Sequence, residues 1–274
     1  MTSAAEQLGF DPSTPLVIVT ADELGFGFAS NEGVRTALDH GAATSAGLMV
    51  PAPWARAASA AHRGQDVGVI LTLNAEHDLY RWGPITQAPS LLDGEGGFPR
   101  TPADLWDHAD VDEVRRECRA QLERAILWGF DVSHISSHLD TAILRPEFFD
   151  VVLELALDYS LALRLPNEEV QETAGFPFRQ LALDEGVALP DRVAVLRGPS
   201  APNVLDVVTS LSPGITEIVF RPAIDTAELR AQAGDAADRV AHLETLCGAA
   251  FADALAAHGA QRISWRDLRS VQRS

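Results

Sequence analysis

The sequence of 274 residues contains no lysine, so all 21 of its basic residues are arginine. This absence excludes enzymes whose chemistry needs a lysine amine: Schiff-base aldolases, pyridoxal-phosphate enzymes, Walker A nucleoside triphosphatases and kinases of the protein-kinase fold. Cysteine is also scarce. The only two, Cys118 and Cys247, do not form a C-x-x-C pattern. A disulfide scaffold and a thiolate zinc site are therefore excluded.

Positive charge is scarce as well, because 21 basic residues face 39 acidic ones and the formal net charge is -18. Such a chain has no basic surplus with which to bind nucleic acid or an anionic membrane surface. No apolar run reaches the length of about 18 residues that a bilayer requires, and residues 1–10 do not resemble a signal peptide. We therefore expect a cytoplasmic protein whose partner is a small molecule.

Short β-branched runs alternate with longer helical segments along the whole chain. Strands are expected at Leu16–Thr20, Thr44–Val50, Val67–Leu73, Val132–Ser136, Leu161–Leu165, Val193–Leu196, Ile215–Phe220 and Arg262–Trp265. Helices are expected at Ser30–His40, Trp54–His62, Val111–Leu127, Glu147–Tyr159 and Ala227–Ala257, the last with a break near Gly234. A Gly/Pro-rich excursion occupies about 74–107. Repeated strand–helix units predict an α/β fold with a parallel sheet, and the strand count favours a closed or nearly closed barrel in a single domain, 1–274.

Polar residues follow several of these strands, at the end of a β/α barrel where catalytic groups lie. Asp22 and Glu23 come directly after the first strand. They are predicted to face a cleft, one as proton acceptor and the other as ligand or electrostatic partner, with Asp22 unpaired. The alternative is a helix-capping aspartate beside a solvated glutamate.

The fourth strand ends in a segment that contains His134, His138 and Asp140. In an extended strand the two histidines would lie roughly 13 Å apart, so one ion could not bind both unless the chain turned between them. His134 is either a core residue or part of a site. Near the C-terminus, Arg221 is predicted to hold an anion or to pair with Asp225.

Several motifs occur together and in a fixed order. They are Val17–Gly25, Asn31–Val34, Thr44–Met49, Gly68–Leu73, His134–His138, Phe220–Ala223 and Ile263–Leu268. In this order they resemble the YdjC-like (ChbG/HpnK) carbohydrate deacetylase family. The resemblance implies a distorted TIM-like β/α barrel that removes acetyl groups from N-acetylated sugars with a divalent metal such as zinc or magnesium. It also implies that Asp22 is the base and that Glu23 and His138 are metal ligands.

The third ligand position of that family is occupied here by Ile70, which cannot bind a metal. Three further positions differ: Glu23 replaces an aspartate and extends its carboxylate by roughly 1.5 Å, Ser136 replaces an aspartate, and Arg221 replaces a histidine. A catalytic metal site usually keeps three protein ligands. These departures predict that the pocket works without a bound metal.

The sequence therefore predicts a hydrolase-type enzyme that acts on a small polar molecule, sugar-like or amide-containing, by metal-independent acid/base chemistry. The predicted catalytic residues are Asp22, Glu23, His138 and Arg221. The predicted substrate contacts are His134, Asn74, Trp82 and Asp140. Two alternatives are a metal-dependent deacetylase whose missing ligand comes from Asn74, Glu76 or His77, and a non-catalytic binding or assembly protein. The excursion at 74–107 is predicted either to cover the pocket or to form the arm of a homodimer.

Overall fold

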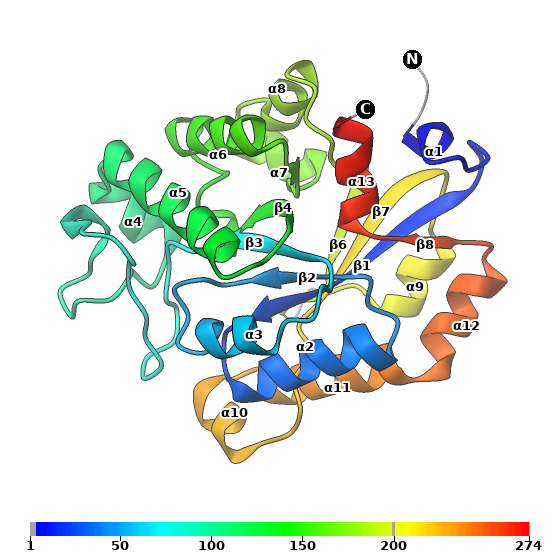
Figure 1. The fold of residues 1–274 in the computed structure, drawn as a ribbon, viewed down its shortest axis with the longest axis horizontal. Helices are drawn as coiled ribbons and strands as arrows, with labels where there is room; N and C mark the ends of the chain where they lie inside the picture. The colour runs from blue at the N-terminus through cyan, green and yellow to red at the C-terminus, as the bar shows by residue number, and fades with distance from the viewer. Residues whose placement is uncertain (1–3, 199–200, 274) are drawn as a thin grey trace.

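Eight strands form one parallel sheet in the computed structural model, which describes residues 4–198 and 201–273 (Figure 1). The strands are β1 (Pro15–Leu24), β2 (Ser45–Leu48), β3 (Val67–Leu71), β4 (Val132–Ser137), β5 (Ala162–Leu163), β6 (Arg192–Val195), β7 (Gly214–Phe220) and β8 (Gln261–Ile263). Their order in the sheet is β5-β4-β3-β2-β1-β7-β6, and β8 pairs with β1.

The sheet curls into a half-barrel because its two end strands are not joined. Within the described ranges, no strand pairing connects β5 to β6. Strand β1 is the longest, and along one edge its first half pairs with β8 while its second half pairs with β2. The prediction of an α/β fold with a distorted TIM-like barrel is thus confirmed.

Helices cover the outside of the curled sheet (Figure 1). They are α1 (Ala4–Gln7), α2 (Phe28–His40), α3 (Ala55–Ala61), α4 (Pro102–His108), α5 (Val111–Leu127), α6 (Pro146–Tyr159), α7 (Glu168–Ala174), α8 (Phe178–Asp184), α9 (Val204–Thr209), α10 (Ala227–Gln232), α11 (Ala236–Cys247), α12 (Ala249–Ala257) and α13 (Trp265–Gln272). Two short 3-10 helices, η1 (Pro89–Leu91) and η2 (His138–Asp140), lie in loops. Helix α5 packs against α6, and α11 packs against α2.

Two boundaries near the C-terminus differ from the sequence prediction. The single helix expected at Ala227–Ala257 is three helices, because the chain breaks at Gly248 as well as near Gly234. The last strand ends at Ile263, because Ser264 forms a capping box with Asp267 and begins α13. In the described part of the chain no single helix has the length and apolar content to cross a membrane, although α11 and α12 pass that test as a pair bent by 57°.

Strand β1 shows how the sequence pattern builds the interior. Its residues alternate between two faces, as successive side chains of a strand do. Leu16 and Ile18 pack in a small cluster with Trp265, whereas Val17 and Val19 belong to the main apolar core. The inner face that begins with Leu16 and Ile18 continues through Thr20 to Asp22. It therefore changes from apolar to polar toward the carboxyl end of the strand.

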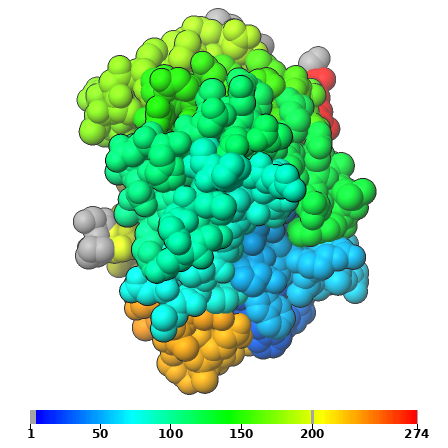
Figure 2. Space-filling view, turned by 90° about the vertical axis from the view of Figure 1, so that its left-hand side faces the viewer, coloured from blue at the N-terminus to red at the C-terminus, as the bar shows by residue number. Residues whose placement is uncertain are grey.

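The excursion at 74–107 folds back onto its own barrel, and Figure 2 shows it in cyan and teal across the face toward the viewer. The Tyr80 hydroxyl donates a hydrogen bond to the carbonyl oxygen of Phe26 (2.6 Å). The Trp82 indole donates one to the carbonyl oxygen of Asn74 (2.9 Å). Contacts of this kind fix the first half of the excursion against the barrel rim.

One glycine is required for close packing of α2. A β-carbon at Gly33 would lie 2.5 Å from the backbone of Ala223 and 2.6 Å from the carbonyl oxygen of Pro222. We therefore expect Gly33→Ala to lower the free energy of unfolding by about 1–3 kcal/mol, as overpacking usually does. Chemical denaturation measures this. Gly94→Ala is the control, since a β-carbon there meets nothing within 4 Å; equal effects of the two variants would contradict the packing.

Candidate active site

A pocket of about 400 Å³ opens at the carboxyl ends of the strands. It is lined by Asp22, Glu23, Ile70, Pro102, Ser137, His138, Leu139, Asp140, Arg164, Val195, Arg197, Val219 and Arg221. A pocket of about 460 Å³ near Asn167 and Arg192 is slightly larger, but it lies by the start of β6, away from the strand ends. The pocket at the carboxyl ends of the strands is therefore the candidate active site, because barrel enzymes place their catalytic groups at that end of the barrel.

A bulge in β1 brings both acidic residues of the Asp22–Glu23 pair to this pocket. Regular alternation would put neighbouring side chains on opposite faces of the strand. Between Ala21 and Leu24, however, three steps along β1 match two steps along β2, and Glu23 adopts a left-handed backbone with φ 66°. The extra residue turns the Glu23 side chain toward the side that Asp22 already faces.

Asp22 is held by an arginine that follows β5. Arg164 donates to both carboxylate oxygens of Asp22, at 2.6 and 3.2 Å, and also to Glu217 of β7. The expectation of an unpaired Asp22 is therefore corrected. Burial raises the pKa of Asp22 above its usual value, with Arg164 acting in the opposite direction.

Glu23 lies between two further arginines. Its carboxylate is 2.6 Å from Arg239 of α11 and 3.6 Å from Arg221, and Asp235 pairs with both of these arginines. Burial alone would raise the pKa of Glu23, but Arg239 and Arg221 outweigh it and lower that pKa to about 2. The predicted pairing of Arg221 with Asp225 is wrong, because Asp225 pairs with Arg230 instead.

His138 is oriented by a carboxylate from the excursion. Its Nε2 lies 2.8 Å from Oε2 of Glu76, and the other Glu76 oxygen accepts a hydrogen bond from Arg197 at 3.0 Å. Burial would raise the pKa of Glu76, but His138 and Arg197 hold it below its usual range. The excursion thus supplies a residue that fixes the imidazole in the pocket.

Asp140 is the one pocket carboxyl group that has no hydrogen bond or ion pair to its side chain within the described structure. Leu139 and Asp140 both have left-handed backbone conformations, with φ of 52° and 55°. Such a conformation costs roughly 1–2 kcal/mol for a residue like leucine, so the surrounding packing imposes it. Burial raises the pKa of Asp140 to about 6.

Three predicted substrate contacts lie outside the lining of the pocket. His134 is fully buried, and its ring stacks on Trp265 with centroids 4.2 Å apart, so it lies in the core and not in the lining of the pocket. The Asn74 amide donates to the carbonyl of Pro99 and accepts from the Thr141 hydroxyl. Trp82 is bonded to the Asn74 backbone and meets the His138 ring edge-on, 6.4 Å between centroids. Asn74 and Trp82 therefore brace the loop that carries Glu76.

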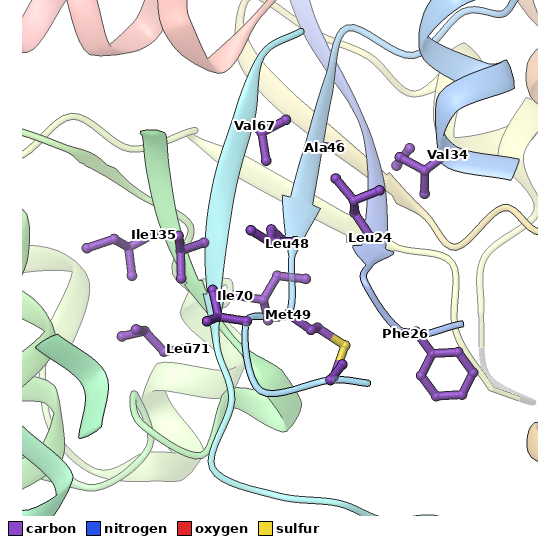
Figure 3. Packing of buried hydrophobic residues seen from close by; sticks show 14 of the residues in the cluster. Leu24, Phe26, Val34, Ala46, Leu48, Met49, Val67, Ile70, Leu71 and Ile135 are labelled. Atoms are coloured by element: carbon purple, nitrogen blue, oxygen red, sulfur yellow. The ribbon is translucent and has the colours of Figure 1, made fainter. Parts of the chain in front are cut away.

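The side chains present do not fit the divalent metal that the resemblance implies. Ile70 lies at the pocket beside Asp22, since a β-carbon on Gly47 would meet Asp22 Oδ1 at 2.5 Å and Ile70 Cδ1 at 2.7 Å. Figure 3 shows Ile70 in the same apolar cluster as Met49. The oxygens of Glu23 face guanidinium groups and Nε2 of His138 faces Glu76. Among the described residues, no group of three His, Cys, Asp or Glu side chains is placed to hold an ion.

Sequence reasoning missed the arginines that organise the pocket, Arg164, Arg197 and Arg239. Arg197 carried a usable signal, since it directly follows the expected strand Val193–Leu196 just as Arg221 follows Ile215–Phe220. Arg164 lies inside the expected strand Leu161–Leu165, so its position did not indicate a strand end. Arg239 lies within α11, where no local pattern distinguishes it from a solvated helix residue.

Comparison with known proteins agrees with this architecture. The family model of YdjC-like proteins matches residues 16–257. A carbohydrate deacetylase of Geobacillus stearothermophilus is 31% identical over 254 residues, 92% of this chain and 97% of the relative. One from Thermus thermophilus is 37% identical over 162 residues, 59% of this chain and 57% of the relative. The crystal structure of a "putative cellobiose-phosphate cleavage protein" from Enterococcus faecalis superimposes with a TM-score of 0.81 at 25% identity, covering 93% of this chain and 99% of that one.

The ion pairs around Glu23 predict a strong effect of its removal. Glu23→Gln leaves Arg221 and Arg239 buried with one compensating carboxylate fewer, so we expect the free energy of unfolding to fall by about 3–5 kcal/mol. Glu32→Gln, which removes a surface pair with Arg35, should cost less than about 1 kcal/mol. Urea denaturation of both variants gives the comparison.

The loss of stability in Glu23→Gln should depend on pH. Because the pKa of Glu23 is lowered from 4.5 to about 2 in the folded state, its stabilisation is complete above pH 4.5 and disappears as the pH falls toward 2. The wild type and Glu23→Gln should therefore differ most near neutral pH. A difference that grew on acidification would contradict the ion-pair assignment.

Proposed function

The chain belongs to the YdjC-like family, and we propose that this deacetylase-like hydrolase cleaves an amide bond of a small sugar-like molecule without a bound metal. The observation that supports the proposal most strongly is that the possible metal-ligand atoms in the pocket are either absent or already paired with other side chains. Ile70 occupies one ligand position, the Glu23 carboxylate is held by arginines, and Nε2 of His138 is held by Glu76. The names of the relatives, carbohydrate and chitooligosaccharide deacetylases, support a sugar-like substrate, and the name of the related crystal structure refers to a phosphorylated disaccharide.

Hydrolysis of an acetamide adds water to the carbonyl carbon, breaks the C–N bond and releases acetate and an amine. His138, fixed by the Glu76 carboxylate, accepts the proton of the attacking water. This pairing is the general arrangement of a catalytic base and the group that orients it. Asp140, whose carboxyl group has no hydrogen bond or ion pair from the described residues, lies at the same pocket and delivers a proton to the leaving nitrogen.

Asp22 and Glu23 act in this proposal as positioning residues. Each carboxylate forms an ion pair with at least one guanidinium group, so each fixes an arginine at the wall of the pocket. Among the described atoms, Nε of Arg221 is buried and has no hydrogen-bond partner. Arg221 is therefore available to bind either the substrate carbonyl oxygen or an anionic group.

One observation favours the metal-dependent alternative. Nε2 of His77 is buried, lacks a hydrogen-bond partner among the described residues, and lies 3.8 Å from Glu76, which itself contacts His138. Arg197, 3.0 Å from Glu76, opposes a cation at that position. Asn74, the other suggested substitute ligand, is fully engaged in bracing the excursion.

Metal content and chelation distinguish the two possibilities. After dialysis against zinc or magnesium, we expect elemental analysis to find no stoichiometric ion, because the potential ligands are held in ion pairs. Acetate release from N-acetylated chitooligosaccharides should persist in EDTA. One tightly bound ion per chain, together with loss of turnover in EDTA, would establish the metal-dependent alternative instead.

Substitution tests the assigned proton-transfer groups. His138→Asn and Asp140→Asn should each lower kcat by about a hundredfold or more, which is the usual contribution of a general base or acid. His40→Asn is the matched control, because His40 is exposed at the end of α2. Thermal unfolding shows whether each variant remains folded. Wild-type kcat in folded His138→Asn would remove His138 from the mechanism.

A further inference from the structure

Three strands that are consecutive in the sequence are each followed by an arginine that lines the pocket. Arg164 follows β5, Arg197 follows β6 and Arg221 follows β7, and all three line the same cavity. They occur in a chain whose formal net charge is -18. Carboxylates pair with each of these arginines, so the site is distinguished by the guanidinium N–H donors that it gathers and not by a net positive charge.

The three arginines are not equivalent. All three side-chain nitrogens of Arg164 donate to Asp22 or Glu217, so its hydrogen-bonding capacity serves the protein itself. Arg197 makes one side-chain hydrogen bond, to Glu76, within the described ranges, and its side chain is 31% exposed. Arg221 is only 7% exposed, and its Nε lacks any partner in the described structure. Arg197 and Arg221 therefore retain donors that a ligand could use.

The strand register places these two arginines at the same level. Val195 of β6 pairs with Val219 of β7. Arg197 and Arg221 each follow two residues later, and residues two apart along a strand share a face. Val195 and Val219 line the pocket too, which agrees with that common orientation. Neighbouring strands are about 4.8 Å apart, and both arginines, which come just after the ends of β6 and β7, line the same cavity as the two valines.

We propose that Arg197 and Arg221 form an oxyanion-binding subsite that takes a carboxylate or phosphate group of the substrate. The inference rests on the proposed function and narrows its substrate class to an anionic sugar. A group with two or three oxygens matches donors from two neighbouring guanidinium groups, and arginine recognises such groups through paired N–H bonds. A single carbonyl oxygen would not use both arginines.

The surrounding acids hold the subsite in shape. Asp235 contacts Arg221 at 2.7 Å, and Glu76 contacts Arg197 at 3.0 Å. Both arginines are thus fixed before a ligand arrives, which reduces the entropy lost on binding. Because each contact engages one terminal nitrogen of its arginine, other N–H groups stay available to the ligand.

Binding of three related sugars tests the subsite in the full-length protein. Isothermal titration calorimetry would compare glucuronate, which carries a carboxylate, glucose 6-phosphate, which carries a phosphate, and neutral glucose. We expect at least one anion to bind about tenfold tighter than glucose, with an affinity that falls as NaCl is raised. The better of the two anions identifies which group the subsite takes.

Variants of Arg197 test whether the preference for anionic sugars arises at this subsite. Arg197→Gln should weaken binding of the preferred anion roughly ten- to a hundredfold while leaving glucose unaffected, as loss of a charged hydrogen bond does. The affinity of Arg197→Lys for the anion should lie between those of the wild type and Arg197→Gln, because lysine keeps the charge but not the paired donors. Arg116→Gln, an exposed arginine of α5 that pairs with Glu113, is the matched control. Circular dichroism confirms that each variant is folded.

The outcomes separate this inference from the proposed function. Equal or undetectable binding of all three sugars to the wild type overturns the subsite, and so does an anion preference that survives in folded Arg197→Gln. Anion preference without acetate release from any N-acetylated sugar would overturn the proposed hydrolysis and leave the subsite intact. Turnover of neutral N-acetylated sugars without anion preference would overturn the subsite and leave the proposed hydrolysis intact.

Discussion

A buried ion triad connects the two sides of this open barrel. Arg164 follows β5, at one end of the strand order, and its guanidinium group binds Asp22 of β1 and Glu217 of β7 across the interior. Glu217 is fully buried and also accepts hydrogen bonds from Thr20 and from the Trp265 indole. A buried charge is tolerated only when it is paired and hydrogen-bonded. The triad therefore links β5 to the β1–β7 side, which no strand pairing among the described residues does, and it forms one wall of the pocket.

The rest of the pocket follows from the same need for compensation. The acidic side chains that face the interior, Glu23 among them, are balanced by guanidinium groups that also restrain their direction. In a metal centre, a cation performs both tasks for its carboxylate ligands. Here arginines that follow β5 and β7, and one from α11, perform them, and the position beside Asp22 holds the apolar side chain of Ile70. An apolar residue at position 70 thus agrees with a pocket whose carboxylates are already paired with arginines.

The sequence predicted the parallel barrel and the polar strand ends, because alternation along β1 and the strand–helix repeat are local patterns. It could not predict that Glu23 shares a face with Asp22, since this depends on a bulge with a left-handed residue. Nor could it pair Asp22 with Arg164, 142 residues away. His134 and His138 differ in environment because the strand ends between them, at Ser137. Helices such as α7 and α8 were missed because seven residues are too few for a clear helical period. Helix α3 is equally short, but five of its seven residues are alanine, the strongest helix former, so its composition indicated a helix.

The arginine network opposes a metal ion beside Glu23 in this pocket. Two unit charges 4 Å apart interact by about 4 kcal/mol at an effective dielectric constant of 20, and a divalent ion doubles that repulsion from each nearby guanidinium group. Arg221 lies 3.6 Å from the Glu23 carboxylate, so an ion on Glu23 would face it directly. A histidine at position 70 alone would not restore a metal centre, because the carboxylate would remain occupied. The apolar side chain of Ile70 and the charge of Arg221 therefore act in the same direction, and together they support the proposal that the pocket works without a metal.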